Sequence, residues 1–269
     1  MKPSNHWAIH TRGRQMPVEL TESLSDEYVE LFDSCVIATE HLCEAQMLAS
    51  RICNNRGRYE GVVSGTPVPW FFVGLVHAME SSLNFQTHLF NGDPLTARTV
   101  HFPPGYPQEG SPPYTWEFSA RAALRRLSVF SHSSWDLGSF LYRLEGYNGF
   151  GYRLYYPSVM TPYLWSFTNH YTKGKYGSDN QFDPDMVSDQ CGAAALAKVL
   201  SLKGLLNFTG VAQRGFCFAR TYSDQGQKLQ AFLNSTLGCA LVEDGVAAEK
   251  TSDVVKEAFG HYLTGDPRC

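Results

Sequence analysis

Apolar residues recur at helical spacing over residues 28–47, the pattern of an amphipathic helix. These positions are Tyr28, Leu31, Phe32, Cys35, Val36, Leu42, Cys43 and Met47. Ser23 and Asp26 precede them at the spacing of a capping box. We therefore predict one long helix, or two, ending near Cys53, where the polar stretch 54–57 interrupts the pattern.

A second pattern, over residues 70–80, is apolar on almost every side. Pro67 and Pro69 stand at its start, where proline is tolerated. A helix that is apolar all round belongs in a protein interior, so this segment predicts a buried central helix, ended by residues 84–92. The nearly apolar run 68–79 is about half as long as a membrane span, so we expect no membrane insertion.

Residues 95–102 are rich in Thr and Val and lie between turn sequences, which predicts a β-hairpin. Further helices are predicted after capping signals. These are 116–127 after Thr115, 137–147 after Ser133 and Asp136, and 186–203 after Asp183 and Pro184, the last ended by Gly204.

Shorter apolar clusters follow Gly204, and we place a domain boundary near residue 205. The sequence thus predicts an N-terminal helical segment (1–58), a larger domain (59–205) and a small C-terminal helical module (206–269). The predicted fold class is mainly α. Within it, the larger domain is α+β, with one small β-hairpin.

The balance of charge speaks against a nucleic-acid partner. The net charge is −4, and Arg125-Arg126 is the only adjacent basic pair, whereas phosphate binding needs a basic face. Aromatic residues make up 13 % of the 269 residues, which suits stacking on a sugar or a nucleobase.

The first residues lack the apolar stretch of a secretory signal, so we expect synthesis in the cytoplasm. The 7 cysteines form no C-x-x-C pair, which fits reduced thiols better than a disulfide framework.

Glu80 closes the apolar segment 70–80, and this position indicates acid chemistry. Burial favours the neutral carboxyl and raises its pKa, as a general acid needs to protonate a glycosidic oxygen near neutral pH. Asp93 lies in a turn sequence, where solvent and amides would keep it charged. Thr99 could help Asp93 to hold an attacking water.

Three stretches carry a resemblance to the lysozyme-like superfamily. HAMESSLNF (77–85) is similar to the Glu-Ser motif of soluble lytic transglycosylases, which implies Glu80 as the catalytic acid and Ser81 as its neighbour in the site. HLFNGDPLTART (88–99) resembles the hairpin of phage lysozymes and implies Asp93 and Thr99 as catalytic partners, with Asn91 in the cleft. The spacing from Glu80 to Asp93 is longer than in phage lysozymes.

LEGYNGFGYR (144–153) resembles the Tyr-Asn-Gly motif that lines the glycan cleft of lytic transglycosylases, and it implies sugar contacts from Tyr147 and Asn148. The segment 160–171 adds aromatic rings that could stack on sugars and an amide that could bind hydroxyls. Its candidate residues are Tyr163, Trp165, Asn169 and Tyr171.

Residues 229–259 resemble one peptidoglycan-binding repeat. The matching positions are Leu229-Gln230, Leu233-Asn234, Gly238, Leu241, Asp244-Gly245, Thr251 and Val255. Asp244-Gly245 suits the tight turn, and Thr251 is predicted to cap the next helix. The alternative is a helical appendage that only covers the larger domain.

The resemblance implies a lysozyme-like enzyme that cuts peptidoglycan between N-acetylmuramic acid and N-acetylglucosamine. In a muramidase, Glu80 would be the acid while Asp93 and Thr99 position water. In a lytic transglycosylase, Glu80 would act alone and release 1,6-anhydro ends. A third alternative is an inactive wall-binding protein of the same fold.

We expect neither a metal nor an organic cofactor. The implied partner is peptidoglycan, and a phage or a contractile injection assembly is one candidate route to the wall. Two rival enzymes are a zinc amidase or endopeptidase using His77, His88 and His101, and a cysteine peptidase using Cys191 with His170. The zinc alternative lacks the H-E-x-x-H motif, and Cys191 falls inside a predicted helical run, where a buried thiol is inert more often than not.

Overall fold

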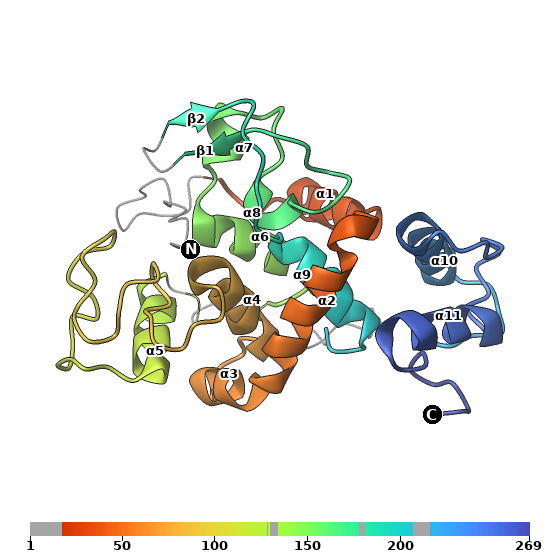
Figure 1. Ribbon diagram of the computed structural model, residues 1–269, viewed down its shortest axis with the longest axis horizontal. Coiled ribbons are helices and arrows are strands. Elements are labelled where there is room, and N and C mark those ends of the chain that lie inside the picture. Colours follow the sequence, from red (N-terminus) through yellow and green to blue (C-terminus); the bar gives the residue numbers. More distant parts are fainter. Residues whose placement is uncertain (1–17, 128, 130–133, 178–180, 207–215) are drawn as a thin grey trace.

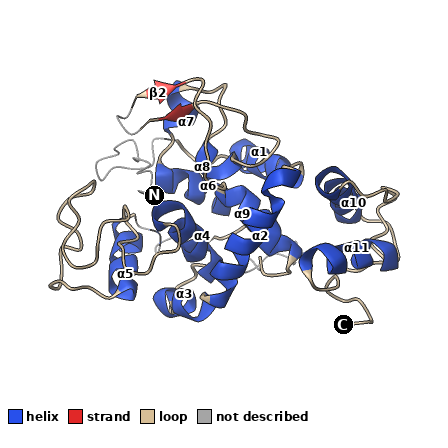
Figure 2. Cartoon of the chain, in the orientation of Figure 1, coloured by secondary structure: helices blue, strands red, loops and turns tan. Residues whose placement is uncertain are grey.

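The computed structural model describes residues 18–127, 129, 134–177, 181–206 and 216–269 (Figure 1). Most of its regular structure is helical, as predicted (Figure 2). The helices are α1 (Glu22–Asp33), α2 (Thr39–Asn54), α3 (Arg56–Val63), α4 (Trp70–Ser81), α5 (Trp116–Arg126), α6 (Leu137–Asn148), α7 (Gly151–Tyr155), α8 (Pro162–Trp165), α9 (Ala193–Leu202), α10 (Asp224–Leu237) and α11 (Glu249–Phe259). None of these helices is both long and apolar enough to cross a membrane.

Helix α4 is the predicted buried central helix. It packs against α2, α3, α6 and α9, and residues 71–79 are all buried. It ends abruptly, because Ser82 and Leu83 both adopt the left-handed conformation, with φ of 52° and 60°. Their amides donate to the carbonyls of Ala78 and His77, each at 3.2 Å. This turn leaves Glu80 in the last turn of the helix.

The N-terminal pattern forms two helices that share the core of the larger domain. Helix α1 packs on α6, and α2 packs on α9 and α4. The cap of α1 is Thr21, whose hydroxyl accepts from the Leu24 amide at 3.2 Å. The predicted Ser23–Asp26 capping box is therefore wrong: Ser23 already lies inside the helix.

The hairpin predicted at 95–102 does not form. That segment contains no strand, and only an isolated bridge joins Thr87 to Pro94 nearby. The amides of Val100 and His101 donate to the carboxylate of Asp93, at 2.8 and 2.9 Å, instead of to a neighbouring strand. In the described chain the sheet lies elsewhere, where β1 (Lys175–Tyr176) pairs antiparallel with β2 (Phe182–Asp183).

The capping signals of α5 and α6 act as predicted, with Thr115 and Asp136 accepting from amides of the first turns. Ser133 lies outside the described residues. Helix α9, in contrast, begins at Ala193 and not at 186. The carboxylate of Asp183 accepts from the amides at 185 and 186, which holds the preceding segment in a turn.

Helices α10 and α11 stand at one end of the molecule, beside α2 (Figure 1). Gln230 links them: its amide donates to Asp244, and its oxygen accepts from Gly245, whose φ is +74°. Thr251 lies within α11 and accepts from Gln230, so its predicted role as a cap is wrong.

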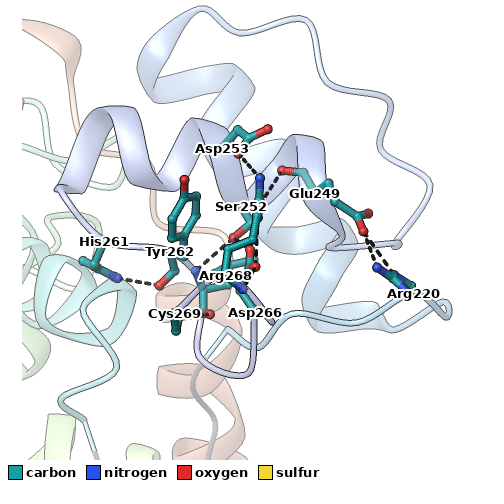
Figure 3. Close-up of polar contacts among 10 residues, drawn as sticks. Arg220, Glu249, Ser252, Asp253, His261, Tyr262, Asp266, Arg268 and Cys269 are labelled. Carbon is teal, nitrogen blue, oxygen red and sulfur yellow. Dashed lines mark hydrogen bonds and ion pairs between the residues drawn. The ribbon is translucent and has the colours of Figure 1, made fainter.

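The chain end is tied to α11 by charged groups (Figure 3). Arg268 donates to Asp253 at 2.6 Å and to Asp266 at 2.8 Å. Asp266 in turn accepts from the buried hydroxyl of Ser252. At the start of α11, where Arg268 also donates to the carbonyl of Glu249, Arg220 pairs with the Glu249 carboxylate at 2.6 Å. These contacts close the C-terminal module around α11.

Candidate active site

Glu80 has the environment of a protonated acid. Its carboxyl is enclosed by protein atoms, although the residue keeps some exposed surface. Burial raises its pKa to about 8, and a hydrogen bond from Tyr163 moderates the rise. Among the residues that the structure describes, no lysine or arginine forms an ion pair with it. The carboxyl therefore keeps its proton at neutral pH.

Two buried tyrosines surround this carboxyl. The Tyr163 hydroxyl, from α8, donates to Glu80 Oε1 at 3.0 Å. The Tyr147 hydroxyl, near the end of α6, donates to the carbonyl of Leu89 at 3.1 Å. Burial raises the pKa of both hydroxyls, and the charge of Glu80 adds to each rise. Both are hydrogen-bond donors that stay protonated while Glu80 titrates.

The loop that follows α4 returns to the end of that helix. Gly92 has φ of +76°, and a Cβ built on it would lie 3.1 Å from the carbonyl oxygen of Glu80. Only glycine suits both this conformation and this close approach. The Asn91-Gly92-Asp93 turn thus lies against the last turn of α4. Ser81 points back into the helix and donates to the carbonyl of His77 at 3.3 Å.

Asp93 is 5 % exposed and its carboxylate is engaged within its own loop. It accepts from Asn91 Nδ2 at 3.0 Å, from the Val100 and His101 amides, and from His101 Nδ1 at 2.5 Å. Burial opposes its ionisation, but these hydrogen bonds outweigh burial and lower its pKa. Three of these donors share Oδ2, and Oδ1 accepts from His101 Nδ1.

The Thr99 hydroxyl also forms its hydrogen bonds within this loop. Its hydroxyl donates to the carbonyl of Pro103 and accepts from the amide of Tyr106 at 2.9 Å. The residue is 3 % exposed. Asn91 completes the arrangement, since it also donates to the carbonyl of Phe102 at 3.3 Å. In this structure Asp93, Thr99 and Asn91 together fix the shape of residues 91–106.

The other residues predicted to contact sugar are buried, bonded to other parts of the protein, or partly exposed. Trp165 and Tyr163 are both fully buried, so a ligand cannot reach either ring, and the predictions that they stack on sugar are wrong. The Tyr171 hydroxyl is used by the Gly174 carbonyl and the Ser188 amide. Asn169 binds Val36 and Ser34, near the end of α1. Asn148, the last residue of α6, is partly exposed.

Two residues near Glu80 were not predicted as site residues. Gln190 donates to the carbonyl of Met79 at 2.7 Å, which places the segment before α9 against the end of α4. Arg126, the last residue of α5, lies close enough to Tyr147 for its charge to lower that hydroxyl's pKa. The sequence marked Arg126 only as half of a basic pair, and nothing marked Gln190.

The histidines of the zinc alternative are separately engaged. His77 contacts the Tyr59 hydroxyl at 3.1 Å, His88 lies 2.7 Å from the Ser119 hydroxyl, and His101 binds Asp93. Across the described ranges, no group of three or more His, Cys, Asp or Glu side chains could hold a metal ion.

Cys191 is a poor nucleophile, which speaks against a cysteine peptidase. Cys191 is 2 % exposed, and burial raises the pKa of its thiol far above the ordinary value. A thiol of this kind stays protonated and unreactive. The imidazole of His170 lies 2.8 Å from the carbonyl of Leu31.

No protein-family model, curated protein or solved structure matches this chain.

Proposed function

We propose that this chain cleaves the glycan strands of peptidoglycan and that Glu80 is the general acid. The observation that carries the proposal is the state of the Glu80 carboxyl: it is enclosed, no lysine or arginine of the described residues pairs with it, its pKa is raised to about 8, and the residue keeps some exposed surface. The motif resemblances around Glu80 and Tyr147 supply the substrate class.

The reaction begins with transfer of the Glu80 proton to the glycosidic oxygen, which breaks the bond to C1 of the muramyl sugar. The sugar then carries oxocarbenium character. The oxygens that could hold an attacking water, on Asp93 and Thr99, are occupied by their own loop. This favours attack by the 6-hydroxyl of the same sugar. Glu80, now a carboxylate, takes that hydroxyl's proton, and the product is a 1,6-anhydro end.

A muramidase is the second candidate, because Asp93 stays ionised and its turn lies against α4 through Gly92. There, water supplies the hydroxyl at C1, and the product is a reducing end. An ionised carboxylate near the site could also stabilise the developing positive charge.

Mass spectrometry of fragments released from purified cell walls separates these outcomes. Anhydro-muramyl ends support the single-acid route, and reducing muramyl ends support the muramidase. Cut peptides with intact glycan would contradict the proposal. A matched digest with Glu80→Gln should release no glycan fragments, and equal release by this variant would remove Glu80 from the chemistry.

We propose further that the C-terminal module holds the enzyme on the wall. The Gln230 contacts shape the turn at Gly245, and the exposed Tyr222 ring lies beside that turn. In the inactive Glu80→Gln protein, Tyr222→Ala should reduce the fraction that sediments with purified walls. Unchanged sedimentation would favour the alternative in which the module only covers the larger domain.

A further inference from the structure

Arg126 is held between two rings of the loop that Asp93 and Thr99 shape. The centre of its guanidinium lies 5.4 Å from the Phe102 ring centroid and 5.3 Å from that of Tyr106. Both distances are within the range of cation–π attraction. The loop therefore fixes the position of this cation.

This cation lacks an acidic partner. Within the described part of the chain, no carboxylate forms an ion pair with Arg126, and its buried Nε has no hydrogen-bond partner. Partly burying a charge without a counter-ion costs free energy, which the two rings offset only in part.

Arg126 also belongs to the surroundings of the acid. It closes α5, and its charge acts on the Tyr147 hydroxyl, on which Glu80 acts as well. Tyr147 thus lies within electrostatic reach of both groups. Both rings that flank Arg126 belong to the loop whose Gly92 lies against the carbonyl of Glu80.

We infer that Arg126 is a specificity residue that binds a carboxylate of the bound glycan strand. This inference rests on the proposed function. Peptidoglycan differs from chitin by the lactyl group on alternate sugars and by the peptide stem that the lactyl group carries. Both can offer a carboxylate, and the planar guanidinium fork suits that anion. Arg126 would then select muramyl-containing strands.

The structural alternative is that Arg126 only clamps the loop through Phe102 and Tyr106. A clamp would affect every sugar ligand equally, whereas a carboxylate receptor affects only ligands that carry one. Arg125 offers a matched control, because it is the adjacent residue, is exposed, and carries the same charge.

The test is calorimetric titration of the full-length Glu80→Gln protein, alone and combined with Arg126→Gln or Arg125→Gln. The probes are a GlcNAc–MurNAc tetrasaccharide with free lactyl carboxylates, the same sugar with peptide stems, and chitotetraose. We expect Arg126→Gln to weaken binding of a carboxylate-bearing probe about tenfold, equivalent to about 1.4 kcal/mol. Chitotetraose binding should not change, and Arg125→Gln should change neither.

The pattern of loss identifies the carboxylate. Weaker binding of the stemless probe alone assigns the lactyl group, and weaker binding of the stem-bearing probe alone assigns the stem. Equal weakening of all three probes, or of none, overturns the inference. Parallel wall digests with the wild-type protein keep the two proposals apart: if fragments appear but Arg126→Gln does not discriminate, only this inference fails. If no glycan fragments appear, the proposed function fails and the inference falls with it.

Discussion

Two glutamates in this protein are removed from water in different ways. Glu145 lies where α6 packs on α1 and is 2 % exposed. It accepts from the Tyr28 hydroxyl at 2.5 Å and pairs with Arg153 at 3.4 Å. Glu80, at the end of α4, also accepts from a tyrosine, yet no lysine or arginine in the described ranges pairs with it, and the residue keeps some exposed surface.

Burial raises the pKa of both carboxyls, so the tyrosine and the burial do not distinguish them. The difference is the counter-ion and the access to solvent. Arg153 favours the charged form of Glu145 and ties it to neighbouring helices, as a structural ion pair does. The comparison teaches that a buried acid without a counter-ion is a candidate for proton transfer.

The largest expected effect separates the two glutamates by activity. Glu80→Gln removes the transferable proton and should lower the rate of glycan release from walls by at least about 100-fold, the lower range for a general acid. Glu145→Gln, assayed well below its unfolding temperature, should keep a rate within about twofold, since its carboxyl takes no part in proton transfer. Equal losses in the two variants would abolish the distinction.

The next effect concerns stability at the Glu145 pair. Arg153→Met leaves Glu145 buried with only Tyr28, and we expect the free energy of unfolding to fall by about 2–3 kcal/mol. This is below the range for fully buried pairs because the Arg153 side chain is 24 % exposed. Chemical denaturation measures it. Arg56→Met, which breaks an exposed pair with Glu60, is the control and should cost less than about 0.5 kcal/mol.

A smaller effect is the pH dependence that Glu80 gives to folding. The folded protein holds this proton up to about pH 8, whereas the unfolded chain releases it near the ordinary pKa. The stability from Glu80 is thus fully present below that ordinary pKa and is lost as pH rises towards 8. Unfolding free energies of wild type and Glu80→Gln should therefore diverge between pH 5 and pH 9, with the variant losing less. Parallel curves would mean that the Glu80 pKa is not raised.

The smallest effect tests the tyrosine hydrogen bond that each glutamate accepts, from Tyr163 at Glu80 and from Tyr28 at Glu145. The Tyr163 hydroxyl stabilises the ionised form of Glu80, so Tyr163→Phe should raise the Glu80 pKa further. Activity falls as Glu80 ionises, and the alkaline limb of the pH–rate profile should move up by less than about one pH unit. Tyr28→Phe, at the Glu145 site, should leave that limb in place. A downward move in Tyr163→Phe would contradict the hydrogen-bond geometry.

Local signals in the sequence were sufficient where structure is decided locally. The apolar run of α4 and the capping groups Thr115 and Asp136 predicted their helices, because neighbouring residues determine both features. The failures come from side chains that take up backbone amides. Asp93 binds the amides that a hairpin at 95–102 would have used, and Asp183 delays the start of α9.

The candidate site was predictable only where it depends on neighbouring residues in the sequence. Glu80 follows from its place at the end of an apolar helix. Its contact with Tyr163 spans 83 residues, and the Arg126 position depends on a loop whose shape the sequence did not predict. Motif resemblance brought Tyr147 to attention. The aromatic residues of segment 160–171 suggested Tyr163 and Trp165, both of which are buried, because a pattern of aromatic residues does not distinguish core from cleft.

The turn that ends α4 has a consequence for heat tolerance. Ser82 and Leu83 both lie in the left-handed region, where a residue with a Cβ is disfavoured by roughly 1–2 kcal/mol. The protein carries this cost one turn from its acid, and burial of Leu83 helps to hold the conformation. A glycine at position 82 would relieve the crowding while the backbone keeps its course. Position 82 is thus a place where an engineer could raise the melting temperature without moving Glu80.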